Sequence, residues 1–183
     1  MKIEATVLKD CFIVYDTIFG DSRGYFFESF NRNTFKNQTG IDVDFVQDNQ
    51  SSSTKGVLRG LHFQRGEFAQ AKLVRVLQGK VLDVVVDIRK NSPTFGKHIK
   101  LELSETSGTQ LYIPRGFAHG FLVLSDTAVF FYKCDSYYNK QSEMGIMYND
   151  ASLNIDWKLP ADELILSEKD QHNPLLNDII DTL

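Results

Sequence analysis

Short strand-like segments separated by turns constrain the fold of this chain most strongly. About ten of them follow one another at regular spacing, and this pattern is typical of a β-sandwich or closed barrel rather than of alternating β/α units. The clearest are Ala71–Leu77, Lys80–Ile88, His98–Leu103, Gly108–Ile113, His119–Leu124 and Ala128–Tyr132. Gln78-Gly79 is expected to be the turn of a hairpin between the first two.

Helix-forming patterns are short. Asn31–Gly40 is expected to hold one helical turn, with Asn33 as its cap. The sequence therefore predicts an all-β protein, a β-sandwich with a few short helices. At 183 residues, and without a linker-like stretch, residues 1–183 are expected to form one domain.

Composition excludes several classes of function. The net charge of -4 provides no basic field for a nucleic-acid duplex. No apolar run approaches the ~20 residues of a membrane-spanning helix, and the first residues carry charges rather than the apolar core of a signal peptide. Cys11 and Cys134 have no metal or redox spacing, which favours a reducing, cytoplasmic setting.

One strand-like stretch, Gly56–Gln64, carries polar residues that a buried strand does not need. Placing Arg59 and His62 in it costs desolvation unless each is paired. His62 is open to two interpretations: a core histidine satisfied by a neighbour, or a general base oriented by a carboxylate. The candidate carboxylates lie in the charged segment Ser167–Asp170, which is otherwise a solvated turn.

Cations and a tyrosine extend the functional interpretation. Lys72 alternates with valines in its strand, so it either lies at a rim with a buried stem or points into a cavity. Together with Arg23, Arg59 and Lys169 it could bind phosphate groups. Tyr132 is either a core tyrosine with a hydrated hydroxyl or a general acid, since a phenol stays protonated at neutral pH.

Metal-binding patterns are weak. The four histidines show neither HxH nor HxxxH spacing. A catalytic transition-metal site usually has three protein ligands. His62, His119 and one carboxylate could supply them, but nothing in the sequence supports this set, and no metal site is predicted.

The motifs in combination resemble one enzyme family, the dTDP-4-dehydrorhamnose 3,5-epimerases. The resemblance begins near residue 5 and continues to the end of the chain, in the family's order. The segments that carry it are Asp21–Gly24, Phe27-Glu28, Gln47–Ser51, Arg59–Gln64, Ala71–Val76, Pro114–Phe121, Tyr132-Lys133, Tyr137-Tyr138 and Leu166–Asp170.

The resemblance implies roles for individual residues. His62 would remove a proton from C3 and then C5 of the sugar, with Asp170 as its partner. Lys72 would stabilise the enolate oxygen at C4, and Tyr132 would return a proton from the opposite face. The positions implied in substrate binding are Phe19, Arg23, Glu28, Gln47, Asn49, Arg59, His119, Tyr138, Glu143 and Lys169.

The resemblance also implies a cupin-like jelly-roll fold that works without a metal or cofactor. His62-Phe63-Gln64 stands where metal cupins carry HxH. The expected reaction converts dTDP-4-dehydro-6-deoxy-D-glucose to dTDP-4-dehydro-L-rhamnose, for surface polysaccharide synthesis. A homodimer that exchanges its N-terminal strands is expected.

Several alternatives stay open at this point. After Glu143 the chain reads Met144–Ala151, where the family more often has Trp followed by Asn/Asp-Asp-Pro. Related enzymes invert C3 alone, or act on GDP-linked 4-keto heptoses. A nucleotide-sugar-binding module without activity and a metal cupin are alternatives from other classes.

Overall fold

The computed structural model describes residues 1–183, and strands dominate it. The strands are β1 (Lys2–Ala5), β2 (Phe12–Tyr15), β3 (Phe19–Asp21), β4 (Gly24–Phe26), β5 (Gln47–Thr54), β6 (Leu58–Gln64), β7 (Lys72–Gln78), β8 (Lys80–Asp87), β9 (His98–Ser104), β10 (Thr109–Ile113), β11 (Phe117–Val123), β12 (Thr127–Cys134) and β13 (Glu143–Gly145). The α-helices are α1 (Arg32–Thr39) and α2 (Leu176–Ile179). Four 3₁₀ turns are η1 (Gly66–Phe68), η2 (Ala161–Glu163), η3 (Asp170–His172) and η4 (Ile180–Thr182).

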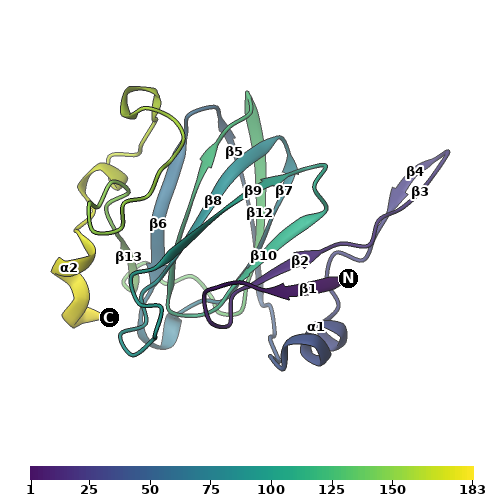
Figure 1. Ribbon diagram of the computed structural model, residues 1–183, viewed down its shortest axis with the longest axis horizontal. Coiled ribbons are helices and arrows are strands. Elements are labelled where there is room, and N and C mark those ends of the chain that lie inside the picture. The colour runs from purple at the N-terminus through teal and green to yellow at the C-terminus, as the bar shows by residue number, and fades with distance from the viewer.

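Two antiparallel sheets form the body of the molecule (Figure 1). One has six strands in the order β1-β2-β10-β7-β12-β5, and the other has five in the order β13-β6-β11-β8-β9. Neighbours in space are mostly distant in sequence, as in a jelly roll. The expectation of an all-β, cupin-like sandwich with few short helices is confirmed.

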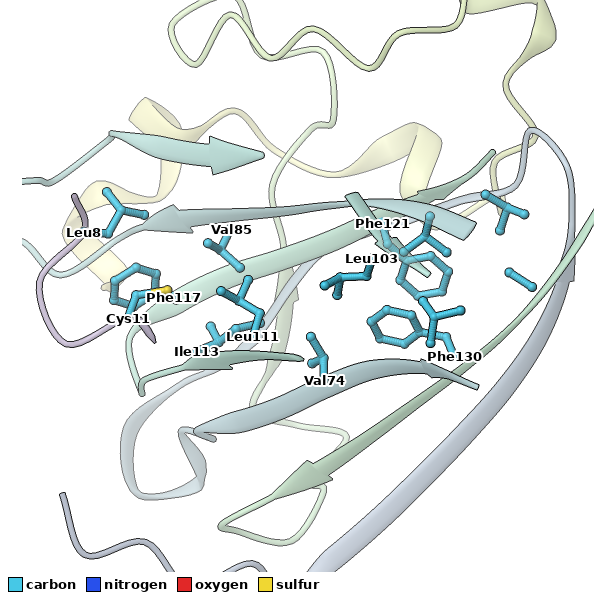
Figure 2. Close-up of a cluster of buried hydrophobic side chains, with 14 residues drawn as sticks. Leu8, Cys11, Val74, Val85, Leu103, Leu111, Ile113, Phe117, Phe121 and Phe130 are labelled. Atoms are coloured by element: carbon cyan, nitrogen blue, oxygen red, sulfur yellow. The ribbon is translucent and has the colours of Figure 1, made fainter. Parts of the chain in front are cut away.

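An apolar core fills much of the space between the two sheets (Figure 2). Val74 and Phe130 project into it from the six-stranded sheet, and Val85 and Phe121 from the five-stranded sheet. The Phe121 and Phe130 rings stack with centroids 4.1 Å apart. Inward-facing residues alternate with outward-facing ones in a strand, so this core determines which side chains of the same strands face the interior.

A second apolar cluster covers the outer face of the five-stranded sheet. The C-terminal third of the chain lies there, seen at the left of Figure 1. Leu58 and Leu122 of the sheet pack with Ile146, Trp157 and residues of α2. The segment after Glu143, where the chain departs from the resembling family, contributes Ile146 and Tyr148 to this packing. This layer brings the C-terminal segment across β6.

Two local expectations were wrong. The cap of α1 is Asn31, whose side-chain oxygen accepts a hydrogen bond from the Thr34 amide at 3.0 Å, and Asn33 lies within the helix. Gly79 does sit in a turn, but β7 and β8 do not pair as a hairpin. They belong to different sheets: β7 pairs with β10 and β12, and β8 pairs with β9 and β11.

The β3–β4 hairpin projects away from the body of the molecule at the right of Figure 1. Phe19, Tyr25 and Phe26 on it are 63%, 73% and 71% exposed. Large aromatic side chains at this level of exposure are a typical sign of an interaction surface. No helix of the chain combines the length and the apolar character that crossing a membrane requires.

Candidate active site

His62 lies on β6 between two strands that fix its backbone. It is opposite His119 of β11 on one side and Gly145 of β13 on the other. Close by, the backbones of β6 and β11 approach so tightly at Gly60 that a Cβ there would lie 2.6 Å from the Cα of Gly120. Only glycine fits such an approach, so the two glycines hold His62 and His119 side by side.

The partner of His62 comes from the C-terminal layer. His62 Nε2 lies 2.5 Å from Asp170 Oδ1, and the two residues are 108 positions apart in the chain. The side chain of Asp170 is 3% exposed and that of His62 is 29% exposed. An ionised carboxylate only accepts hydrogen bonds, so Nε2 carries the proton and Nδ1 keeps the free lone pair of a base.

Asp170 is held in its ionised form. Burial acts to raise its pKa, but the hydrogen bond and charge of His62 and the hydroxyl of Ser167 outweigh burial, and the net pKa is lowered. An ionised carboxylate behind the imidazole stabilises the imidazolium that forms when His62 takes up a proton. This geometry agrees with the interpretation of His62 as a general base that is oriented by a carboxylate.

The six-stranded sheet contributes an ammonium and a phenol. Lys72 Nζ lies 5.6 Å from the centre of the Tyr132 ring. Burial lowers the pKa of Lys72, against the opposing effects of Cys134, Asp83 and Glu143. Burial also raises the pKa of Tyr132 to about 12. Tyr132 is therefore protonated at neutral pH. Lys72 forms no ion pair, since the nearby carboxylates of Asp83 and Glu143 pair with His119 and Lys169 instead.

A second histidine–carboxylate pair lies beside the first. His119 Nε2 is 2.8 Å from Asp83 Oδ2, and both residues are buried. The other oxygen of Asp83 is buried without a hydrogen-bond partner. Asp83 was missed in the sequence. Its position in the apolar strand β8 could have identified it, because a carboxylate buried among valines needs a partner or has a role in a site.

Polar residues from several elements form the rim. Glu143 binds Lys169 at 2.6 Å and accepts a hydrogen bond from the Tyr138 hydroxyl at 3.1 Å. Gln47 accepts one from the Tyr138 amide at 3.0 Å and donates one to Asn49 at 3.0 Å. Lys169 adjoins Asp170 in sequence, so this rim is continuous with the His62 pair.

Two residues connect the rim with the interior. Asn49 is opposite Tyr132 in the β5–β12 ladder. The Arg59 guanidinium donates to the Ser53 hydroxyl at 3.1 Å, and its charge acts on the pKa of Tyr132. Eleven of the sequence-predicted residues thus cluster: His62, Asp170, Lys72, Tyr132, His119, Gln47, Asn49, Arg59, Tyr138, Glu143 and Lys169.

Three predicted residues lie apart from this cluster. Phe19 and Arg23 are on the projecting hairpin, where Arg23 binds Asp21 at 2.6 Å. Glu28 follows the hairpin and accepts a hydrogen bond from Asn31 at 3.1 Å. The polar contacts of Arg23 and Glu28 stay within this segment, and neither forms a hydrogen bond or ion pair with His62, Lys72 or Tyr132.

The structure brings together no set of side chains that could bind a metal ion. No group of three or more His, Cys, Asp or Glu side chains lies close enough together to hold a metal ion. His62 and His119 are neighbours, but each directs Nε2 at a carboxylate.

The two sheets together define a class of protein. A base with a free lone pair stands on one sheet, and an ammonium and a protonated phenol stand on the other. Such a site can remove a proton, stabilise the resulting anion and return a proton to another face. The chain is thus a cupin-like sandwich whose clustered side chains include the groups that an acid–base isomerase requires.

Comparison with known proteins identifies the family. A sequence profile of the dTDP-4-dehydrorhamnose 3,5-epimerases matches residues 5–178. The chain is 52% identical over 180 residues to the dTDP-4-dehydrorhamnose 3,5-epimerase of Escherichia coli, covering 98% of this chain and 97% of the relative.

Solved structures agree with the profile. The enzyme of the same name from Elizabethkingia anophelis is 57% identical, with a TM-score of 0.94 over 97% of both chains. A dTDP-6-deoxy-D-glucose-3,5-epimerase from Legionella pneumophila, solved in complex with dTDP-4-keto-L-rhamnose, is 49% identical with a TM-score of 0.92, over 96% of this chain and 93% of that one. The chain belongs to the dTDP-4-dehydrorhamnose 3,5-epimerase family, a family of isomerases.

Proposed function

We propose that the protein inverts C3 and C5 of dTDP-4-dehydro-6-deoxy-D-glucose and so forms dTDP-4-dehydro-L-rhamnose. Membership of the family and the ligand of the Legionella relative support this substrate. The observation that carries the mechanism is the placement of His62–Asp170 on one side of the site and Lys72 with Tyr132 on the other sheet.

The chemistry follows from the C4 ketone. C3 and C5 both adjoin it, so loss of a proton from either carbon gives an enolate. His62 Nδ1 takes the proton, and the negative charge that develops on the C4 oxygen is stabilised by Lys72. Tyr132 then donates its proton to the opposite face of the same carbon. Return of a proton from His62 to Tyr132 through solvent restores the site for the second carbon.

The remaining clustered residues bind the nucleotide in this proposal. Arg59 and Lys169 carry positive charge for the pyrophosphate, with Gln47 and Asn49 as hydrogen-bonding groups. Tyr138, which is 51% exposed, packs on the base. His119, held by Asp83, and Glu143 line the sugar pocket.

Deuterium uptake tests the proposed reaction. In heavy water, NMR should show exchange at both C3 and C5 of dTDP-4-dehydro-6-deoxy-D-glucose. Uptake at C3 alone would make the protein a 3-epimerase. Faster uptake with a GDP-linked 4-keto heptose would show that this heptose, and not the dTDP sugar, is the substrate. Crystal soaks with dTDP and with GDP would show which base the pocket accepts. No uptake with any 4-keto sugar nucleotide would leave a binding module, and stoichiometric iron or zinc on His62 would indicate a metal cupin.

Tyr132→Phe should damage turnover more than the first proton abstraction. The substitution removes the phenol that returns the proton and leaves His62–Asp170 intact. Product formation and deuterium uptake, measured on the same sample, should therefore separate, with product formation reduced by about 10²-fold or more. Tyr112→Phe is the matched control, because Tyr112 packs with Phe35 away from the site. Turnover equal to wild type would remove Tyr132 from the mechanism.

A homodimer with exchanged N-terminal strands is part of the proposal. The exposed aromatic side chains of the β3–β4 hairpin support it. So does the position of Phe19, Arg23 and Glu28 outside the cluster of their own chain. In such a dimer the hairpin of one subunit would bring these residues to the nucleotide of the other.

Mixed dimers test the exchange. Co-expression of His62→Ala and Arg23→Ala chains would give mixed dimers with one intact site and one doubly defective site. Random pairing should then restore about one quarter of wild-type activity, whereas each variant alone stays impaired. If the hairpin served its own chain, every site in the mixture would be defective and nothing would be restored.

We also place the reaction in the cytoplasm. Cys11 and Cys134 are both buried and unpaired, which is compatible with a reducing compartment. Fractionation of cells that produce the protein would test this location.

A further inference from the structure

Ser167 contacts the carboxylate behind the base from the side opposite to His62. The Ser167 hydroxyl donates to Asp170 Oδ2 at 2.9 Å and accepts from the Asp170 amide at 3.1 Å. Asp170 Oδ1 is the oxygen that faces His62 Nε2. Each carboxylate oxygen therefore has its own partner, and the carboxylate cannot rotate without breaking one of the two bonds.

Asn173 restrains the same group from a third direction. Its amide donates to Asp170 Oδ1 at 3.4 Å. The amide is itself pressed against Gly145, where a Cβ would lie 2.4 Å from Asn173 Oδ1. Gly145 is opposite His62 in the β6–β13 ladder. The strand pair that holds the imidazole thus also holds one support of its carboxylate.

We propose that Ser167 is a positioning residue for proton abstraction: it holds the Asp170 carboxylate in the orientation that keeps the proton on His62 Nε2 and the lone pair on Nδ1. This rests on the role of His62 in the proposed function. Without the hydroxyl, Oδ2 loses its side-chain donor, and the bonds that remain on Oδ1 hold the carboxylate less firmly against rotation away from Nε2. The imidazole would then populate both tautomers, and only one of them presents the base.

The chain offers a matched control in the same C-terminal layer. Ser152 donates its hydroxyl at 2.7 Å to the buried carboxylate of Asp150, which in turn accepts the Leu176 amide at 2.7 Å. This pair has the chemistry of Ser167–Asp170 but contacts no histidine. Ser152→Ala therefore reports what loss of a serine–carboxylate hydrogen bond does to the layer alone.

The experiment compares Ser167→Ala, Ser167→Thr and Ser152→Ala with wild type. Deuterium uptake at C3 and C5 should fall about 10-fold in Ser167→Ala, the effect of one hydrogen bond to a charged group. It should recover in Ser167→Thr, which keeps the hydroxyl, and stay unchanged in Ser152→Ala. The ¹⁵N NMR signals of His62 in the ligand-free protein should shift from the Nε2–H tautomer toward a mixture only in Ser167→Ala.

Two results would overturn the proposal. Wild-type uptake with an unchanged tautomer in Ser167→Ala would show that Asp170 needs no such support. Equal losses in Ser167→Ala and Ser152→Ala, with the tautomer unchanged, would indicate a general loosening of the layer. If wild type itself exchanged no protons, the proposed function would fail instead, and the tautomer measurement would still test Ser167.

Discussion

Replacing His62 by alanine should abolish measurable proton exchange at C3 and C5 while nucleotide binding remains nearly intact. A positioned general base contributes about 10²–10⁴-fold to a rate, and His62 is the imidazole whose Nε2 faces Asp170 with Nδ1 left as a base. The groups proposed to bind the pyrophosphate and the base, such as Arg59 and Tyr138, make their contacts within the chain independently of His62. Calorimetric titration with dTDP would measure the binding.

A histidine elsewhere on the same sheet supplies the control for this substitution. His98 lies on β9, at the edge of the five-stranded sheet farthest from β13. His98→Ala removes the same side chain from the same sheet and should leave exchange at the wild-type level. Exchange retained in His62→Ala, with binding unchanged, would place the base on another residue.

Lys72→Met should lower the exchange rate at both carbons by about 10²–10³-fold, the usual effect of removing one group that stabilises a developing oxyanion. The methionine keeps most of the apolar stem but has no charge. Lys72 is partly buried and forms no ion pair with a carboxylate, so its removal also relieves an unfavourable desolvation. We therefore expect the melting temperature to stay level or to rise while activity falls, a combination that a damaged fold would not give.

The adjacent strand provides a lysine for comparison. Lys133 on β12 follows Tyr132 and points to the outer face, where it binds Asp48 at 2.9 Å. Lys133→Met removes an ammonium without touching the site and should retain full exchange. A fall in the melting temperature of Lys72→Met that accompanies its fall in exchange rate would contradict the role of Lys72 in stabilising the oxyanion.

The same lysine predicts an alkaline limit. Its pKa is lowered by burial, with Cys134, Asp83 and Glu143 opposing, so wild-type exchange should fall as the pH rises through a value below 10.5. Tyr132 does not set this limit, because its pKa is raised to about 12. Lys72→Arg, whose guanidinium stays charged, should lose rate overall but should not show the alkaline fall. A fall at the same pH in both proteins would assign it to another group.

Much of the fold could be predicted from alternation and turn residues, and the two errors of this prediction have separate causes. The strands from Lys72 to Cys134 were located within a few residues, since apolar alternation is a local property. The pairing of β7 with β8 was wrong because Gly79 only reverses the chain, and the choice of sheet depends on partners such as β10 and β12. The cap of α1 was misplaced by two residues because Asn31 and Asn33 offer the same side chain.

The site was predicted through resemblance more than through pattern. His62 and Arg59 stood out as polar residues in an apolar stretch, yet no spacing in the sequence connects His62 with Asp170. Asp83 was missed although it is buried in the middle of β8. The residue types indicated acid–base chemistry. The meeting of His62 and Asp170, however, depends on how the C-terminal layer places η3 over β6, and no local sequence pattern describes that packing.

Because the site is divided between two sheets, the apolar core between them also determines how much space is left for the sugar ring. Val74 and Phe130 lie two residues from Lys72 and Tyr132 and pack against the facing sheet. Their volumes set how far the ammonium and the phenol stand from the imidazole, across sheets that pack about 10 Å apart. Substrate range in such a sandwich can therefore change through core residues that never touch the sugar, without alteration of any catalytic group.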